Sequence, residues 1–494
     1  MGIIKKNLRK KKIAVLVVGA GAAGNLVLDE IKRHGSLNYK IIGFVDDDPK
    51  KQNKCINGIC VLGKIQQIPK IVKANKIKEI IIAIPSASGM QNKRIVNKCE
   101  EAKVTFRIIP GIYEMLKHDT AAGLLREVEL EDLIRRKPID FDSESIKSYI
   151  TNKTIFVSGA GGSIGRELCL QILKFYPRKL ILFDHEENSL NDVFSELRNS
   201  FSNIDVVPIV GNICERNKIK RLFVQFKPDV VFHSAAYKHV PMMEFNVAEC
   251  IKNNVFGTLN MVEEARAGNV KRFVFISSDK ALKPASIMGA SKNIGEMIVK
   301  DASRNSRTNF SIVRFGNVLI SRGSVVPLFV KQIKERQAIT ITHRKMTRYF
   351  MTLPEAAQLV IQAGALSKGG EIFVLDMGKP IKIIDLAKDM IRLSGLRPYK
   401  DIPIVYVGMR PGERLNEPHF EFSKKLQPSD HERILLAAPI LVNHKRLFSS
   451  LGKLRTLVFF EDKNKIVKEI KKIVPSFKEA SYGRKTSDSR WQAS

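Results

Sequence analysis

One segment reads Thr154-Ile-Phe-Val-Ser-Gly159-Ala-Gly161-Gly162-Ser-Ile-Gly165, an apolar strand pattern followed by a glycine-rich turn and a helix pattern. Glycine lets the backbone of such a turn approach a pyrophosphate closely, and the helix N-terminus adds amide donors and positive potential. The next strand pattern ends at Asp184, whose carboxylate would bind an adenosine ribose and repel a 2′-phosphate. The spacing predicts a dinucleotide site that favours NAD over NADP. A tight turn without a ligand is the alternative.

Further apolar strand patterns follow, separated in most cases by helix patterns. They cover residues 179–184, 205–211, 229–235, 272–278 and 309–316. This alternation predicts a doubly wound parallel α/β sheet of residues 154–440, with irregular pieces after residue 321 forming a small substrate-binding part. Ile466, Ile470, Ile473 and Val474 form the apolar stripe of a final helix within residues 441–494, and the tail from residue 476 is expected to be flexible.

The glycine pattern occurs a second time near the N-terminus, where Gly19, Gly21 and Gly24 follow the strand pattern 13–18. Asp46 closes the next strand pattern, as Asp184 does in the first case. We expect a small Rossmann-like domain over residues 13–135, joined by a linker over 136–153. Its turn predicts a second nucleotide site. That site could be regulatory, could bind a different nucleotide, or could be a structural relic.

Composition describes a basic globular protein. The 494 residues include 83 Lys and Arg against 50 Asp and Glu, a formal charge of +33, and 44% are hydrophobic. These values exclude wholesale disorder and allow two or three domains. The lysines are spread along the chain and no nucleic-acid-binding motif accompanies them, so we expect no nucleic-acid partner.

The first twelve residues stand apart as a basic segment. Six cations occur there without an acid: Lys5, Lys6, Arg9, Lys10, Lys11 and Lys12. The cluster suits an anionic membrane surface, and a solvated flexible terminus explains it equally well. No signal peptide or spanning helix is recognisable, so we expect a soluble cytoplasmic protein, with the inner face of the membrane as its potential docking surface.

Cysteines give no sign of a disulfide framework or a metal site. The six residues are Cys55, Cys60, Cys99, Cys169, Cys214 and Cys250, and none of them forms a CxxC pair. We interpret all six as buried or incidental thiols and expect no metal.

An acid and a base stand side by side directly after the strand pattern 272–278. Ser278, Asp279 and Lys280 lie where the carboxyl end of a doubly wound strand faces the ligand crevice. Met288 and Lys292 follow four residues apart, on one face of the next helix pattern. A solvated ion pair is the plain interpretation of Asp279 and Lys280, but their place in the sheet favours chemistry.

These motifs resemble the extended short-chain dehydrogenase/reductase (SDR) superfamily. The resemblance is strongest to the large, two-domain branch of bacterial nucleotide-sugar 4,6-dehydratases acting on UDP-N-acetylglucosamine in polysaccharide biosynthesis. It covers about residues 13–440 and is carried by Val157–Gly165, His233–Pro241, Ser278–Lys280, Met288–Lys292, Val313–Val318, Thr347–Thr352, Arg410–Glu413 and Gly43–Pro49. Family members usually carry transmembrane helices before the first α/β domain, whereas this sequence opens on the basic segment.

The resemblance implies two Rossmann-like domains, NAD, a UDP-sugar substrate and a homo-oligomer. Implied cofactor contacts are Gly159, Gly162, Ser163, Ile164, Gly165, Asp184, Asn212, Ile213, Ala235 and Lys292. Implied substrate contacts are Lys238, His239, Arg314, Asn317, Arg348 and Arg410, with the arginines on the UDP phosphates and uridine, although each arginine could be a surface ion pair instead. The family usually has Thr at Ser278 and Asp at Asn212, and Pro418 disfavours the local helix expected there.

The implied chemistry is oxidation at C4 of the sugar, removal of the C5 proton and loss of the C6 hydroxyl as water. In this scheme Asp279 is the acid at C6, Lys280 the base at C5, and Lys292 holds the nicotinamide ribose. Met288 occupies the usual tyrosine position, and a thioether cannot take the C4 hydroxyl proton, so Ser278 would relay it. Two alternatives stay open: a 4-epimerase or C4 reductase on the same fold, and a non-catalytic nucleotide sensor or membrane-surface scaffold.

Overall fold

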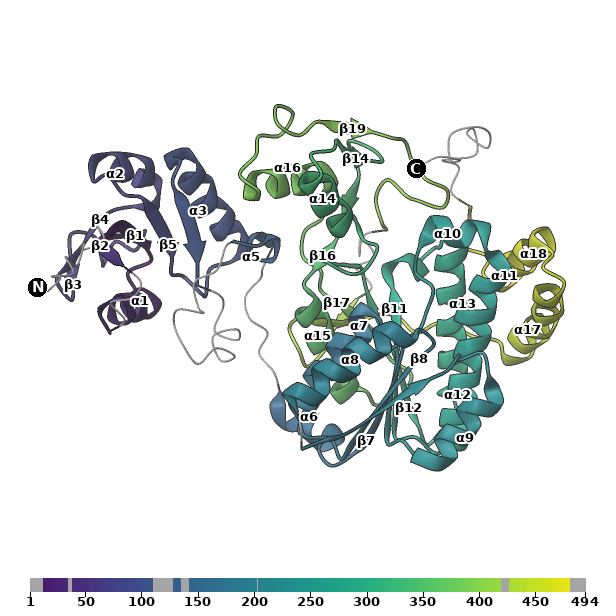
Figure 1. Cartoon of the computed structure of the whole chain (residues 1–494). Coiled ribbons are helices and arrows are strands. Elements are labelled where there is room, and N and C mark those ends of the chain that lie inside the picture. The colour runs from purple at the N-terminus through teal and green to yellow at the C-terminus, as the bar shows by residue number, and fades with distance from the viewer. Residues whose placement is uncertain are drawn as a thin grey trace, which may run out of the picture. The chain divides into compact units, whose positions relative to one another are not determined.

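The computed structural model describes residues 12–33, 38–109, 128–134, 142–201, 203–418 and 426–479. The chain divides into two compact units, Met1–Pro138 and Ile139–Ser494 (Figure 1). Most of the basic segment, residues 1–11, lies outside the described residues, as does the tail from residue 480. The tail was expected to be flexible from residue 476, but Phe477 is buried in the core of the second unit, so the start of that prediction was wrong. Across the described ranges, no helix combines the length and the apolar character that crossing a bilayer requires.

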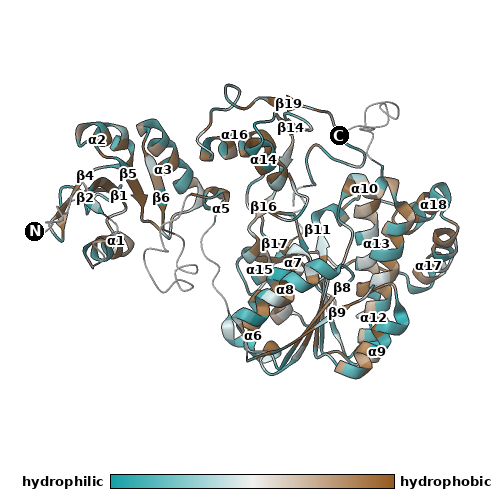
Figure 2. Cartoon of the chain, viewed as in Figure 1, coloured by the Kyte–Doolittle hydropathy of each residue, from teal (hydrophilic) through white to brown (hydrophobic). Residues whose placement is uncertain are grey.

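The first unit is a three-layer α/β domain. Its strands, in the sheet order β3-β4-β2-β1-β5-β6, are β3 (Cys55–Ile56), β4 (Ile59–Gly63), β2 (Tyr39–Val45), β1 (Ile13–Val18), β5 (Glu79–Ile82) and β6 (Thr105–Ile108). All neighbours are parallel except the hairpin β3–β4. Its helices are α1 (Ala22–Arg33), α2 (Ile68–Ala74), α3 (Gly89–Ala102) and α5 (Leu130–Ile134). Figure 2 shows the hydrophobic colour along β5, whose four residues are all buried, as the position of a central strand in a covered parallel sheet requires.

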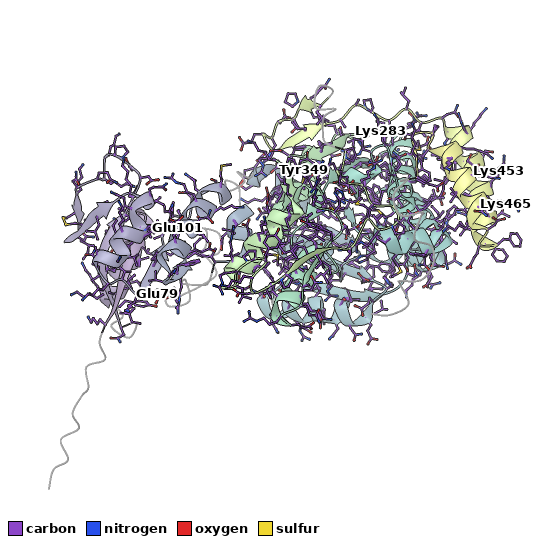
Figure 3. All side chains as sticks on the ribbon, turned by 90° about the horizontal axis from the view of Figure 1, so that it is seen from above. Glu79, Glu101, Lys283, Tyr349, Lys453 and Lys465 are labelled. Atoms are coloured by element: carbon purple, nitrogen blue, oxygen red, sulfur yellow. A yellow bond between two sulfur atoms is a disulfide. The ribbon has the colours of Figure 1, made fainter. Side chains whose placement is uncertain are left out.

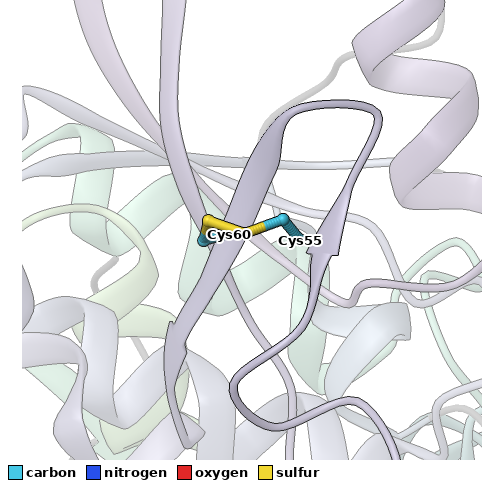
Figure 4. The surroundings of a disulfide bond; sticks show 2 residues. All are labelled: Cys55 and Cys60. Carbon is cyan, nitrogen blue, oxygen red and sulfur yellow. A yellow bond between two sulfur atoms is a disulfide. The ribbon is translucent and has the colours of Figure 1, made fainter.

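Two cysteines in this unit differ from the sequence interpretation. Cys55 and Cys60 form a disulfide across the β3–β4 hairpin (Figure 4), where the two residues are direct cross-strand partners. Their interpretation as incidental thiols was wrong because five-residue spacing gave no hint of hairpin pairing. The other four cysteines are free.

The second unit is built on a nine-stranded sheet. In order across the sheet, its strands are β20 (Gln427–Pro428), β21 (Ile434–Leu436), β17 (Ile372–Leu375), β12 (Asn309–Phe315), β11 (Arg272–Ser278), β10 (Val230–His233), β7 (Thr154–Ser158), β8 (Lys179–Asp184) and β9 (Asp205–Val210). The strands from β17 to β9 are parallel, and β20 and β21 close one edge antiparallel. The predicted doubly wound α/β sheet is confirmed.

Helices cover both faces of this sheet, each over its own hydrophobic core. One face carries α6 (Ser143–Ile150), α7 (Ser163–Leu173), α8 (Glu187–Ser200) and α15 (Leu353–Leu366). The other carries α9 (Arg216–Phe226), α10 (Val240–Phe245), α11 (Val247–Ile251), α12 (Thr258–Ala267), α13 (Ile287–Ala302), α17 (His444–Phe459) and α18 (Lys463–Ile473). Lys453 and Lys465, labelled in Figure 3, lie on the α17–α18 hairpin at the surface.

Part of the segment expected to be a linker belongs to the second unit. Helix α6 buries Ile146, Tyr149 and Ile150, and the Tyr149 hydroxyl donates to the carbonyl of Ile361 in α15 at 2.6 Å. The segment is polar overall, but the three apolar residues of its helix share one face, which the sequence interpretation overlooked. The C-terminal region likewise holds two packed helices instead of one, with the predicted stripe of α18 buried.

Short strand pairs and two helices form a smaller subdomain beyond the carboxyl ends of the main strands. Its elements are β13 (Asn317–Val318), β16 (Phe350–Met351), β14 (Ile339–Ile341), β19 (Ile404–Tyr406), β15 (Thr347–Arg348), β18 (Ile381–Lys382), α14 (Val325–Lys334) and α16 (Ile383–Leu393). Residues 317–351 of this subdomain precede α15 and β17, and residues 381–406 follow them, so two separate stretches of the chain build it (Figure 1).

Candidate active site

The acid–base pair sits at the carboxyl end of β11, in the middle of the nine-stranded sheet. A short 3₁₀ helix, η5 (Asp279–Ala281), begins there with Ser278 as its N-cap. Oδ1 of Asp279 accepts hydrogen bonds from Oγ of Ser278 at 2.8 Å and from Nζ of Lys280 at 3.0 Å. Nζ of Lys280 also donates to Oδ1 of Asn317, at 3.0 Å. Because β10 and β12 flank β11, the Asp279 carboxylate is almost completely buried.

The second oxygen of that carboxylate, Oδ2, is buried and accepts no hydrogen bond from the residues that the structure describes. A Cβ placed on Gly316 would lie 3.0 Å from this oxygen, so glycine leaves the space beside it open. A buried carboxylate oxygen is costly to leave without a donor. The site therefore offers an acceptor that a substrate hydroxyl or a water can satisfy.

A third charged residue, Glu417, joins the pair and was missed by the sequence interpretation. Its Oε1 lies 3.4 Å from Nζ of Lys280 and 3.6 Å from Nε of Arg348. Burial alone would lower the pKa of Lys280, but the carboxylates of Asp279 and Glu417 outweigh that effect and raise it. In this arrangement Lys280 is an ammonium between two carboxylates.

Helix α13 carries Met288 and Lys292 past the end of β11. Met288 is buried in the hydrophobic core. Nζ of Lys292 donates to the carbonyl of Ile276 at 2.6 Å and lies 4.1 Å from the ring centroid of Phe275. Burial lowers the pKa of Lys292 to about 7, against an opposing effect of Glu296. Lys292 thus contacts the backbone of β11 three residues before Asp279.

The glycine turn after β7 has the close packing of a dinucleotide-binding turn. Gly159 has φ +72, and a Cβ there would lie 2.6 Å from the amide nitrogen of Ala235. A Cβ on Gly165 would lie 1.9 Å from the carbonyl oxygen of Gly159. The buried carboxylate of Asp184 accepts the amide of Gly161 at 2.9 Å, so it lies directly beside the turn. Only glycines allow this geometry.

The other expected cofactor contacts gather at the same edge of the sheet. Gly162 is the N-cap of α7, and Ser163 and Ile164 form its first turn. Asn212 follows β9 and accepts the amide of Cys214 at 2.9 Å, and Ile213 is buried against Gly257. The carboxyl ends of β7 to β10 therefore bring the expected cofactor residues together.

A loop after β13 reaches the glycine turn and was also missed from the sequence. The amide of Arg322 donates to Oγ of Ser163 at 3.1 Å, and its guanidinium contacts the Ser189 hydroxyl. Ile320 opens this loop with φ +56, a strained value for a β-branched residue. The loop places a guanidinium beside the turn, where a ligand diphosphate would lie.

Three of the expected substrate residues form a basic group. His239 has its pKa lowered first by burial and then by the positive charges of Lys238 and Arg410. Burial also lowers the pKa of Lys238. The guanidinium of Arg410 pairs with Glu413 at 2.7 Å. Mutual repulsion of this kind is relieved by an anion, so the group suits the phosphates of a substrate.

Two arginines that were expected to bind substrate make contacts within the protein. Arg314 makes a two-pronged ion pair with the fully buried Glu296, at 2.7 and 2.5 Å, and the same carboxylate accepts the Ser277 hydroxyl at 2.6 Å. Arg348 donates to backbone carbonyls of Thr347, Arg414 and Leu415 at 2.7–3.1 Å. The expectation for Arg314 was wrong, because this residue is part of the core. Arg348 fastens the segment that carries Glu417, and its contact with substrate stays a prediction.

The N-terminal glycine turn has the same local geometry. Gly19 has φ +103, a Cβ on Gly24 would lie 2.1 Å from the carbonyl oxygen of Gly19, and the buried Asp46 accepts the amide of Ala20 at 2.8 Å. The predicted residues Gly19, Gly21, Gly24 and Asp46 are thus brought together.

Comparison with known proteins gives two family matches and several relatives. The family described as "Polysaccharide biosynthesis protein" matches residues 155–439, and a "CoA-binding domain" matches residues 1–110. Capsular polysaccharide biosynthesis protein CapD of Staphylococcus aureus is 48% identical over 410 residues, which are 82% of this chain and 68% of CapD. An inverting UDP-N-acetylglucosamine 4,6-dehydratase of Campylobacter jejuni is 33% identical over 54% of this chain and 76% of its own length. The X-ray structure of Pen from Bacillus thuringiensis matches with a TM-score of 0.54 and 33% identity, over 60% of this chain and 92% of Pen.

Proposed function

The chain belongs to the polysaccharide biosynthesis protein family of extended SDR proteins, and from this premise we propose that it is an NAD-dependent 4,6-dehydratase of UDP-N-acetylglucosamine. The family comprises nucleotide-sugar dehydratases and epimerases. One observation favours a dehydratase: the buried cluster of Asp279, Lys280 and Glu417 at the end of β11. Eliminating water needs an acid and a base that a simple epimerase does not need.

The residues at the glycine turn fit NAD. Gly159, Gly162 and Gly165 allow the backbone to approach a diphosphate, and Arg322 can pair with it. The Asp184 carboxylate would bind the adenosine ribose, and Lys292 the nicotinamide ribose. When bound, NAD supplies the reversible oxidation of the sugar at C4, which makes the C5 proton acidic.

The acid and the base arise from one proton transfer within the pair. Lys280 is an ammonium 3.0 Å from the Asp279 carboxylate, and moving its proton across that contact gives a neutral amine and a carboxylic acid. A substrate that excludes water favours this uncharged pair, because desolvation disfavours charged groups. The amine of Lys280 then takes the C5 proton. The acid of Asp279 protonates the C6 hydroxyl, whose bond to C6 breaks as the C5–C6 double bond forms. The hydride taken from C4 would then return to C6 and the Lys280 ammonium would protonate C5, so the net change is the loss of one water.

The C4 hydroxyl needs its own proton acceptor, because the thioether of Met288 cannot serve. Ser278 is hydrogen-bonded to Asp279 at 2.8 Å, so its hydroxyl can pass the C4 proton of the sugar to that carboxylate during the oxidation. Asp279 then releases this proton to solvent before it takes the proton of Lys280 for the elimination. The phosphates of the UDP group would lie against Lys238, His239 and Arg410. Similarity to the C. jejuni dehydratase supports UDP-N-acetylglucosamine as the sugar nucleotide.

Incubating the full chain with NAD and UDP-N-acetylglucosamine tests the proposal, with UDP-glucose in a parallel reaction. We expect a product lighter by one water from UDP-N-acetylglucosamine. A product of unchanged mass with inverted C4 would identify a 4-epimerase instead. Absence of turnover with bound NAD would favour a nucleotide sensor.

A further inference from the structure

The N-terminal unit contains a cavity of about 590 Å³ beside its glycine turn. The cavity is bordered by Gly19 and Gly21 after β1, by Asp46 and Asp47 after β2, and by residues 83–87 after β5. The direction in which the chain adds strands to the sheet reverses between β1 and β5. Strand β2 lies on one side of β1, whereas β5 and then β6 lie on its other side. Ligands of open α/β sheets bind at such a switch point, outside the carboxyl ends of the strands.

One glycine at this cavity is not explained by packing of the protein itself. A Cβ on Gly19 would lie 2.6 Å from the carbonyl oxygen of Ala83, and one on Gly24 would collide with the carbonyl of Gly19. Gly21 differs, because a Cβ there would meet only Nζ of Lys51, at 3.9 Å, and its φ is not positive. The bare backbone at Gly21 therefore leaves open room that a ligand can use.

A positive potential lies over this open backbone. Helix α1 begins at Ala22, directly after Gly21, so its unpaired first-turn amides lie at the turn. The ammonium of Lys51 lies over Gly21 and is about one-third exposed. Both features suit a ligand diphosphate.

Carboxylates border the same cavity. Burial would raise the pKa of Asp46, but the amides of Asp48 and Ala20 and the ammonium of Lys51 outweigh it and lower the pKa. Asp46 is therefore an anion at the position that binds ribose hydroxyls in such folds. Asp47 and Asp48 follow it, and of the nearby cations Arg94 pairs with Asp47 at 3.1 Å and Lys51 with Asp46 at 3.0 Å. Three carboxylates against two cations disfavour a further phosphate on the ribose.

We propose that this cavity binds a nucleoside diphosphate group whose ribose carries no additional phosphate. An adenine nucleotide such as NAD or a uridine nucleotide such as a UDP-sugar can supply this group. Coenzyme A, the ligand in the description of the matching family, carries a 3′-phosphate that would face Asp46 and its two neighbours. The proposal concerns a site in the first unit and does not depend on the reaction proposed for the second.

Counting binding sites on the full chain tests the proposal. ADP, UDP and coenzyme A are titrated separately by calorimetry into the wild type, Gly21→Val and the control Gly452→Val. Gly452 lies in α17, where a Cβ meets nothing within 4 Å, so the same change there leaves both units intact. ADP can also bind at the glycine turn of the second unit. The number of sites lost from the wild type to each variant is therefore the quantity that tests the proposal.

We expect Gly21→Val to lose one site for ADP, for UDP or for both, and Gly452→Val to keep all sites. The nucleotide whose binding is lost shows whether the cavity takes an adenine nucleotide or a uridine nucleotide. Lys51→Met, which leaves the turn itself unchanged, should weaken the same site about tenfold, the cost of one charge-assisted hydrogen bond. Unchanged ADP and UDP binding in both Gly21→Val and Lys51→Met would overturn the proposal. So would a Gly21-dependent site that binds coenzyme A at least as tightly as ADP.

Discussion

Oε1 of Glu417 lies 3.4 Å from Nζ of Lys280, so a buried carboxylate from the far C-terminal part of the sequence completes the charge cluster at the end of β11. Glu417 raises the pKa of Lys280 together with Asp279. It also pairs with Arg348, which holds the backbone of residues 414 and 415. The position of this segment and the protonation of Lys280 are therefore linked through one side chain.

Glu417→Gln should move the pH dependence of turnover. Removing one of two negative charges beside Lys280 lowers the pKa of its ammonium, so the pair loses the one proton that it needs at lower pH. We expect the falling limb of kcat to shift toward acid, while Glu335→Gln on the exposed end of α14 leaves the profile unchanged. An unshifted limb with a merely reduced rate would show that Glu417 has only a structural role.

Asp279→Asn should lose water elimination by a factor of about 10²–10⁴, the usual contribution of a positioned acid or base. The amide cannot protonate the C6 hydroxyl, whereas the glycine turn that binds NAD is untouched. Turnover is followed by mass spectrometry and NAD binding by calorimetry. Normal elimination by this variant would remove Asp279 from the mechanism.

Met288→Leu should keep most of the activity, because Met288 fills space in the core and volume-conserving exchanges there cost little. Lys280→Met, in contrast, should abolish exchange of the C5 proton with solvent deuterium. An inactive Met288→Leu that folds normally would mean that the thioether takes part in the reaction.

Lys292 should make stability depend on pH above neutrality. Its pKa is lowered to about 7 in the folded protein, compared with about 10.4 in an unfolded chain. Between these pH values the unfolded state binds more protons than the folded state. The contribution of Lys292 to the free energy of unfolding therefore rises with pH, by up to about 1.4 kcal/mol per pH unit. Urea unfolding at several pH values should show this rise in the wild type and a flatter dependence in Lys292→Met. Parallel curves would mean that Lys292 stays protonated in the fold.

NAD should bind more tightly than NADP, because the buried Asp184 carboxylate would face the 2′-phosphate. Titration of both cofactors into the wild type measures the preference, and Gly21→Val separates it from binding to the first unit. Tighter binding of NADP would contradict the role given to Asp184.

Sequence reasoning recovered what depends on local spacing. Both glycine turns, each with its aspartate one strand later, and the pair Asp279 and Lys280 could be predicted because the residues concerned lie on adjacent elements of a βαβ unit. Each of these features is made of a few consecutive residues at the carboxyl end of a strand, which is where a parallel α/β sheet binds its ligands.

Contacts between distant segments could not be predicted in this way. Glu417 and Arg322 reach the site through irregular loops, which carry no periodic hydrophobic pattern. The polar stretch Ser321–Ser324, where the alternation of strand and helix patterns stops, was the one sign of the loop that carries Arg322. Arg314 was misassigned because strand residues alternate between faces: it pairs with Ser277 in the neighbouring strand, and both side chains meet Glu296 of α13. One residue earlier or later in the strand, a side chain faces the opposite layer.

Mass spectrometry of the reaction run in deuterated water tests the central claim most directly. The full chain with NAD and UDP-N-acetylglucosamine should give a product that has lost one water and gained one non-exchanging deuterium, because the C5 proton is removed by Lys280 and replaced from solvent. A product of unchanged mass without deuterium would contradict the account, since it would show that the charge cluster at the end of β11 carries out no elimination.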